Sequence, residues 1–208
     1  STTAATDQRH SLISYYGRLN YTLMKRYLLT ATVRRDGSSR FAKNNRWGTF
    51  PSVALAWRVS QENFFEPLRG FVNDFKLRAS YGVTGQQDGI GNYGYIPVYT
   101  AGLDGAQYQF GGKPVYTYRP EAYNPELKWE TTKSWNYGFD LSLLNNRFTF
   151  SADYYTRKTE NLLATVPVPA GTNFDKAMLE NVGNVDSKGL ELAVTAHVVD
   201  TKDWSWNV

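Results

Sequence analysis

Four carboxylates, Asp153, Glu160, Asp186 and Glu191, are the residues that come nearest to an acid–base pair in this chain. Glycoside hydrolysis uses two carboxyl groups at a set separation on either side of a sugar bond. All four residues fall on or beside segments that alternate as strands, and nothing in the sequence positions a substrate between two of them. A glycoside hydrolase fragment is therefore one hypothesis, without an identifiable catalytic pair.

No other set of residues has the spacing of a reactive site. Cysteine is absent, which excludes disulfides, thiolate zinc sites and cysteine nucleophiles. The two histidines, His10 and His197, are too far apart in the sequence to suggest a metal site or a triad. Residues 111–114 lack the Walker spacing, and Pro114 stands where Ser or Thr should follow the lysine. We expect no catalytic residue, no metal, no cofactor and no enzymatic activity.

Charge and aromatic content narrow the class of partner. The formal net charge of +4 over 208 residues is too mild to indicate a nucleic-acid partner, which usually requires a concentrated basic stripe. The aromatic share is 15%, with 15 tyrosines, in a chain whose mean hydropathy is −0.50. Tyrosine has an apolar body and a polar tip, so it suits a membrane interface or a sugar-binding face.

The longest expected loop, at about residues 84–128, is the best candidate for contact with a ligand or partner. Aromatic faces stack on sugar rings and form interface hot spots. The alternative is a loop that packs on itself or on neighbouring loops. The candidate residues are Tyr93, Tyr95, Tyr99, Tyr108, Phe110, Tyr116, Tyr118 and Tyr123.

A second loop, at about residues 35–46, is basic. Its cations, Arg34, Arg35, Arg40, Lys43 and Arg46, could contact anionic lipopolysaccharide or substrate. The alternative is a solvated loop that uses these side chains in internal hydrogen bonds.

The elements that must position these loops are strands, because apolar residues recur at every second position. The alternation predicts roughly eight strands, at residues 13–21, 27–33, 53–59, 75–83, 135–143, 148–154, 190–198 and 204–208. Many approach the ~9–11 residues of a tilted membrane strand, whereas the longest apolar run, 53–57, is far short of a spanning helix. If the sheet is a barrel wall, the lipid-facing candidates are Phe75, Leu77, Tyr81, Trp135, Tyr137, Phe139, Leu141, Phe148, Phe150, Tyr154, Leu190, Leu192 and Val194.

One hairpin can be predicted to the residue. A two-residue turn at Asn145-Asn146 is plausible because asparagine tolerates positive φ. Pairing from this turn places apolar residues opposite apolar residues, and a slip of one residue would destroy the match. The predicted pairs are Leu143–Phe148, Leu141–Phe150, Phe139–Ala152 and Tyr137–Tyr154.

The connections alternate in length. Short turns are expected near Lys25, Asn145 and Thr201, and long loops at about residues 35–46, 84–128 and 157–188, with a medium link at 61–74 that could hold a helical turn. Transmembrane barrels show this asymmetry, with short periplasmic turns and long external loops. The alternative is a soluble β-sandwich carbohydrate-binding module, in which the apolar face would be the core.

An ordered string of motifs resembles the C-terminal barrel half of SusC/RagA-type TonB-dependent transporters. Single pieces are weak signals, but their order and spacing together are specific, and they cover nearly the whole chain. The pieces are Arg34-Arg35-Asp36-Gly37-Ser38-Ser39-Arg40-Phe41, Asn45-Arg46-Trp47-Gly48, Phe50-Pro51-Ser52, Ala56-Trp57-Arg58 with Glu62, Lys76-Leu77-Arg78-Ala79-Ser80-Tyr81-Gly82, Thr84-Gly85-Gln86, Asn124-Pro125, Leu127-Lys128-Trp129-Glu130, Asn136-Tyr137-Gly138 with Asp140, Asn181-Val182-Gly183 and Lys188-Gly189-Leu190-Glu191-Leu192.

The resemblance implies an importer in the outer membrane of Bacteroidota. Its fold would be an antiparallel, up-and-down, 22-stranded barrel closed by an N-terminal plug, of which residues 1–208 form one partial barrel domain without the plug. Its partners would be a SusD-like surface lipoprotein, TonB through a missing N-terminal region, membrane lipid and lipopolysaccharide, and an oligosaccharide or peptide substrate. Because the chain starts at Ser1 in a polar stretch and stops at Val208 within an apparent strand, we expect it to be an internal piece of a longer protein.

Overall fold

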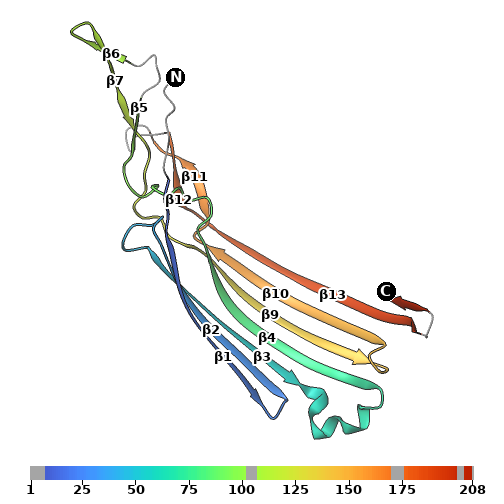
Figure 1. Ribbon diagram of the computed structural model, residues 1–208. Coiled ribbons are helices and arrows are strands. Elements are labelled where there is room, and N and C mark those ends of the chain that lie inside the picture. The colour runs from blue at the N-terminus through green and yellow to red at the C-terminus, as the bar shows by residue number, and fades with distance from the viewer. Residues whose placement is uncertain (1–7, 102–106, 170–175, 201–203, 208) are drawn as a thin grey trace.

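The computed structural model describes residues 8–101, 107–169, 176–200 and 204–207. Its main element is a long, curved sheet of eight antiparallel strands (Figure 1). In sheet order the strands are β1 (Leu12–Leu23), β2 (Tyr27–Ser38), β3 (Trp47–Arg58), β4 (Val72–Gln86), β9 (Glu130–Leu143), β10 (Phe148–Glu160), β13 (Asn184–Asp200) and β14 (Ser205–Asn207). The eight strands confirm the alternation in the sequence, and strands that follow one another along the sheet pair directly.

The register aligns side chains of one kind across the sheet. Since side chains of a strand alternate between its two faces, an in-register row of apolar residues must lie on a single face. Such a row crosses seven strands at Tyr21, Leu29, Leu55, Ala79, Tyr137, Tyr154 and Leu190. We call the side that carries this row the apolar face, and the opposite side, which carries Arg78, Asp140 and Asp153, the polar face.

The hairpin between β9 and β10 has the predicted register. Leu143 pairs with Phe148, and the three further apolar pairs follow in order. Asn145 and Asn146 adopt φ values of 59° and 62°, the left-handed conformation that asparagine tolerates better than most residues. The structure therefore confirms both the position of this turn and the face on which its apolar residues lie.

Short connections gather at one end of the sheet, which we call the turn end. They include residues 24–26 and 144–147. The medium link lies at the same end and holds two 3₁₀ helices, η1 (Val59–Gln61) and η2 (Asn63–Leu68), where a helical turn was expected. The turn expected near Thr201 lies outside the described residues. No helix among the described residues is long and apolar enough to cross a membrane.

Long connections gather at the other end, the loop end, and they start later than the sequence pattern predicts. Strands β2, β4 and β10 continue to Ser38, Gln86 and Glu160, while β9 and β13 begin at Glu130 and Asn184. Apart from Val185 these added residues are not apolar on either face, so they do not alternate, although their backbones still pair. The loops are consequently residues 39–46, 87–129 and 161–183 rather than about 35–46, 84–128 and 157–188.

Three small hairpins build the loops. β5 (Tyr99–Ala101) pairs with β8 (Tyr118–Pro120), and β6 (Gln107–Phe110) pairs with β7 (Lys113–Tyr116). β11 (Leu163–Pro167) pairs with β12 (Ala177–Asn181). Figure 1 shows the first two hairpins extending well past the end of the large sheet, and we call them the aromatic arm.

Candidate functional site

The polar face carries a cluster of charges at the middle of the sheet. The guanidinium of Arg78 donates to Asp140 at 2.9 and 3.0 Å and to Asp153 at 2.9 Å, and the ammonium of Lys76 lies 2.7 Å from Asp140. Gly138 of β9 lies between Arg78 of β4 and Asp153 of β10 in the ladders, and a Cβ placed there would be 2.3 Å from Asp153 Oδ1. Glycine is therefore required for Asp153 to reach Arg78, and both carboxylates are held in ion pairs.

The remaining acid–base candidates are also parts of the strand framework. Glu160 lies 2.6 Å from Lys133 and 3.3 Å from Lys158. Asp186 and Glu191 stand opposite Lys158 and Asp153 in the β10–β13 ladder. These carboxylates line strands, and Asp153 and Glu160 accept bonds from cations, so they form no recognisable catalytic pair.

The two histidines lie at opposite ends of the sheet. His10 precedes β1 at the loop end, whereas the carbonyl of His197 accepts a bond from Arg147 at the turn end. Within residues 8–101, 107–169, 176–200 and 204–207, no group of three His, Asp or Glu side chains is arranged to hold a metal ion.

A compact hydrophobic cluster lies at the loop end. It joins Phe41 from the loop between β2 and β3, Phe50 from β3, Ile90 and Leu127 from the long loop, and Trp129 just before β9. The Trp129 ring is 4.9 Å from that of Phe41 and 5.5 Å from that of Phe50. Phe41 and Leu127 are completely buried. We call these five residues the loop-end cluster.

Hydrogen bonds connect the loops that meet around this cluster. The backbone N–H of Lys128 donates to Asn181 Oδ1 at 2.8 Å, and Asn181 Nδ2 donates to the carbonyls of Lys128 and Asn161, each at 2.9 Å. Trp129 Nε1 donates to the carbonyl of Arg46 at 3.3 Å. The family motifs at residues 40–46, 124–130 and 181–183 thus fix three loops to one another.

The basic loop divides into two kinds of arginine. Arg34 forms an ion pair with Asp36 at 2.7 Å, and Arg40 donates to Asn92 at 3.2 Å and to the carbonyl of Gln87. These two side chains fulfil the internal role. Arg35 instead places its guanidinium carbon 5.3 Å above the ring of Trp47.

The aromatic arm exposes most of the predicted ligand-contact residues. Tyr99, Tyr108, Phe110 and Tyr118 are 60–69% exposed. Tyr93 and Tyr116 are also exposed, whereas Tyr95 and Tyr123 are half-buried nearer the base of the loop. The structure therefore separates two inner tyrosines from six outer aromatic residues.

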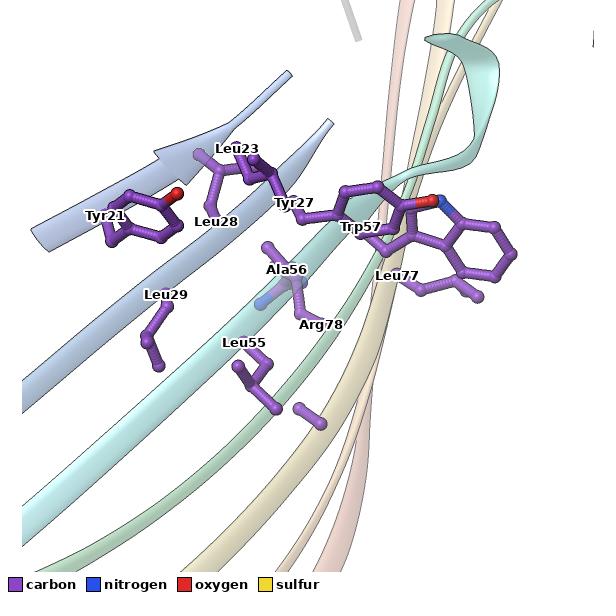
Figure 2. Close-up of a pocket in the computed structure, with 11 residues that line it drawn as sticks. Tyr21, Leu23, Tyr27, Leu28, Leu29, Leu55, Ala56, Trp57, Leu77 and Arg78 are labelled. Carbon is purple, nitrogen blue, oxygen red and sulfur yellow. The ribbon is translucent and has the colours of Figure 1, made fainter. Parts of the chain in front are cut away.

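The thirteen predicted lipid-facing residues lie together on the apolar face. In the register, Phe75, Leu141, Phe150 and Val194 form one row, and Leu77, Phe139, Ala152 and Leu192 form the next. Leu192 is 70% exposed, and Leu190 and Val194 are exposed to a similar degree. Near the turn end this face has an apolar hollow, bordered in Figure 2 by Leu29, Leu55, Tyr27 and Trp57.

The sequence did not reveal a group of hydrogen bonds that centres on Glu62 beside this hollow. Glu62 accepts bonds from Tyr27 Oη at 2.6 Å, Arg26 Nη1 at 2.8 Å and Trp57 Nε1 at 3.0 Å. The bonds from Tyr27 and Trp57, followed by the charge of Arg26, lower the pKa of Glu62 from its ordinary 4.5. The available signal was the motif in which Glu62 follows Trp57 by five residues. That motif alone does not predict a hydrogen bond between the two side chains.

An open antiparallel sheet with one exposed apolar face, short turns at one end and long loops at the other defines the wall of an outer-membrane β-barrel. The chain belongs to the family described as "TonB dependent receptor-like, beta-barrel", whose model matches residues 1–208. The barrel architecture, the outer-membrane location and the SusC/RagA resemblance are thereby confirmed.

Curated relatives agree with this assignment. The chain is 48% identical over 200 residues to TonB-dependent receptor SusC of Bacteroides thetaiotaomicron, covering 96% of the chain and 20% of that protein. It is 40% identical over 207 residues to TonB-dependent receptor P39 of Formosa agariphila, covering 99% and 19%. The chain thus spans about a fifth of the length of these relatives.

Solved structures show the same fold. The RagAB peptide importer in its closed-closed state matches with a TM-score of 0.81 and 30% identity, over 94% of this chain and 21% of that one. The ferric enterobactin receptor PfeA of Pseudomonas aeruginosa matches with a TM-score of 0.60 and 19% identity, over 92% and 25%. The second similarity concerns the fold alone.

Proposed function

We propose that this chain is part of the barrel wall of a TonB-dependent importer that takes up glycans or peptides with a SusD-like surface lipoprotein. In this proposal TonB acts through a region that these 208 residues do not contain. The exposure of the aromatic arm beyond the loop-end cluster is the observation that carries the proposal, because exposed aromatic rings on an anchored loop are suited to a ligand or partner.

In the proposal the apolar face contacts membrane lipid. Trp47 and Trp57 lie ten residues apart on this face of β3. A rise of ~3.4 Å per residue separates them by about 34 Å along the strand, or about 26 Å across a membrane at a tilt of ~40°. That separation matches the ~25 Å apolar band of outer-membrane barrels, which aromatic residues border on both sides.

The polar face would line the inside of the barrel. Its ion pairs among Arg78, Asp140 and Asp153 would be too costly against lipid, whereas a wet or plugged interior can solvate them. This division of faces also disfavours the soluble carbohydrate-binding module. A sandwich would cover the apolar face with a second sheet, and the described residues supply only the small loop hairpins.

The arm can be tested in the full-length protein in its native membrane. Tyr118→Ala combined with Phe110→Ala removes two exposed rings, whereas Tyr118→Phe with Phe110→Tyr keeps both. At ~1–3 kcal/mol per stacked ring, we expect the first variant to lose at least about tenfold in ligand or lipoprotein affinity. The second variant should retain wild-type affinity.

The measurements are uptake of fluorescent oligosaccharides and peptides, and co-purification of a SusD-like lipoprotein. Uptake should also stop when TonB is deleted. Unchanged uptake and co-purification in the double alanine variant would show that the arm binds neither the ligand nor the lipoprotein. Uptake that persists without TonB would contradict the proposal that import depends on TonB.

A further inference from the structure

The link between β3 and β4 differs from the other connections at the turn end. It runs from residue 59 to residue 71, whereas the two turns described beside it are residues 24–26 and 144–147. Short turns are usual at the periplasmic side of a barrel. The link also carries Phe64, Leu68 and Phe71, each more than half exposed, although a solvated turn has no need of apolar side chains. Both its length and its apolar surface require an explanation.

The link passes around the end of β3 from the polar face to the apolar face. Ser60 is buried, and its hydroxyl donates at 2.6 Å to Asp74, which is in phase with the polar face in the ladder. Two residues later Glu62 accepts bonds from Tyr27 and Trp57, which are paired with each other on the apolar face. The residues after Glu62 therefore start on the side of the sheet that carries the apolar rows.

The 3₁₀ helix η2 is amphipathic. Side chains three residues apart in a 3₁₀ helix lie one above the other, so six residues form three sides. Two sides are apolar and one is polar. The pairs that form them are Phe65 with Leu68, Phe64 with Pro67, and Asn63 with Glu66.

Two contacts hold η2 beside the apolar face. Phe65 is buried, and its ring lies 6.2 Å from the ring of Phe75, a residue of that face. The guanidinium of Arg69 donates to the carbonyls of Ser60 and Glu62, each at 3.3 Å, which ties the end of η2 back to its start. The helix is thus packed on the sheet and does not extend away from it.

The position of η2 along the sheet coincides with the margin of the apolar band. Trp57 lies in the Leu77 row, and the Phe75 row is two residues nearer the turn end. At ~3.4 Å per residue and a tilt of ~40°, the Phe75 row is about 5 Å closer to the periplasm than Trp57. Since Trp57 marks the periplasmic border of the band, η2 lies at the level of the lipid headgroups.

Exposed apolar residues continue into the neighbouring turns. The carbonyl of Phe71 accepts a bond from the backbone N–H of Leu144 at 3.0 Å, which joins the link to the β9–β10 turn. Leu144 and, in the β1–β2 turn, Met24 are also exposed. A contiguous exposed apolar surface marks a contact with protein or membrane. Because this one is continuous with the apolar face through Phe65 and Phe75, the lipid that covers that face is the occupant it fits.

We propose that the β3–β4 link is a membrane-interface anchor that inserts Phe64 and Leu68 into the periplasmic leaflet. Amphipathic segments bind membranes by lying in the interface with the apolar side ~5–10 Å inside the headgroup boundary. Asn63 and Glu66 face the periplasm, and Glu62 is the positioning residue that keeps the link on the lipid side of the sheet. The inference rests on the proposed lipid contact of the apolar face and is independent of the substrate.

The test uses the full-length transporter, with any cysteine outside these 208 residues replaced by serine, in vesicles of phosphatidylethanolamine and phosphatidylglycerol. Single cysteines at Phe64→Cys and Leu68→Cys each carry a fluorophore. Glu66→Cys is the matched control on the polar side of the same helix, and Leu192→Cys reports on the apolar face. Nitroxides near the headgroup or near the end of the acyl chain are the lipid quenchers, and iodide is the quencher in water.

We expect the shallow nitroxide to quench positions 64 and 68 more strongly than the deep one does, and iodide to quench them weakly. Glu66→Cys should show strong iodide quenching and weak nitroxide quenching. Adding Glu62→Ala to the Phe64→Cys variant should lower its shallow quenching toward that of Glu66→Cys. Adding Glu66→Ala, the same change four residues later, should leave it unaltered. Heat-modifiable gel migration checks that each variant retains its barrel.

The outcomes separate this inference from the proposal on which it rests. Strong nitroxide quenching at Leu192→Cys with strong iodide quenching at 64 and 68 would overturn the anchor alone, because the link would lie in water. Protection of 64 and 68 from both quenchers would also overturn it, by showing that the link packs on protein. Weak nitroxide quenching at Leu192→Cys would overturn the lipid contact of the apolar face and the anchor together. Unchanged quenching after Glu62→Ala would overturn the positioning role of Glu62.

Discussion

The loop-end cluster and the aromatic arm are both rich in aromatic residues and share one loop, yet they differ in almost every physical respect. Phe41 and Leu127 in the cluster are completely buried, whereas Phe110 and Tyr118 in the arm are each 69% exposed. Hydrogen bonds between residues of the family motifs connect the three loops around the cluster. The arm is supported only by the short β5–β8 and β6–β7 pairings among the described residues. The comparison shows that aromatic content alone does not identify a contact surface, because a ring that stabilises the loops is unavailable to a ligand.

The largest expected effect separates the two regions by stability. Leu127→Ala opens a cavity among Phe41, Phe50 and Trp129, so we expect a loss of about 3 kcal/mol in the free energy of unfolding. Phe110→Ala, a larger truncation in the arm, should cost less than about 0.5 kcal/mol. Urea unfolding of the full-length transporter in lipid vesicles measures both. Equal losses would contradict the distinction between cluster and arm.

A second change tests the hydrogen bonds around the cluster. Asn181→Ala removes one acceptor and two donor contacts, leaving the carbonyls of Lys128 and Asn161 without this partner. We expect a loss of about 2 kcal/mol and faster amide exchange in residues 124–130. Gln109→Ala in the arm is the amide control and should leave exchange at those residues unchanged. The role assigned to Asn181 fails if exchange there is unaffected.

A third change examines the arm by itself. Tyr118→Ala should alter the free energy of unfolding by no more than about 0.5 kcal/mol, because its exposed ring buries little surface. It should nevertheless reduce binding of ligand or lipoprotein. A thermal unfolding curve gives the first quantity and a binding titration the second. A large drop in stability without a change in binding would make the arm a structural element.

The smallest expected effect concerns the turn end, where the contacts centre on the hydrogen-bonded carboxylate of Glu62 and not on a hydrophobic cluster. Because the pKa of Glu62 is lowered in the fold, its ionised form stabilises the native state above pH 4.5. That contribution is lost as the pH falls from 4.5 through the lowered pKa. Glu62→Gln should therefore reduce the loss of stability between pH 5 and pH 3, as followed by tryptophan fluorescence. An identical pH profile in the variant would contradict the assignment.

The sequence predicted the strands because period two survives wherever one face is apolar. From Phe75 to Val83 and from Trp135 to Leu143 the alternation is unbroken, and the hairpin register followed from matching its two sides. The strand ends were predicted too short for the same reason. Residues 130–134 are polar on both faces, so their pairing with β4 and β10 left no periodic signal.

The contacts at both ends of the sheet were beyond the sequence alone. Phe41, Leu127 and Trp129 come from separate loops, and no periodicity relates them. The motifs around them marked their importance without stating that they touch. Likewise, the sequence placed Arg34 and Arg35 together in one basic loop, while alternation on a strand sends them to opposite faces. Only the three-dimensional arrangement shows that Asp36 binds one and Trp47 lies under the other.

The most direct test of the account asks which face of the sheet meets lipid. These 208 residues contain no cysteine, so single cysteines at 190–194 can each carry a fluorophore once any cysteine elsewhere in the full-length transporter has been replaced by serine. In vesicles with nitroxide-labelled acyl chains, we predict strong quenching for Leu190→Cys, Leu192→Cys and Val194→Cys, and weak quenching for Glu191→Cys and Ala193→Cys. Quenching that does not alternate, or that is stronger at 191 and 193, would contradict the assignment of the apolar face to the membrane.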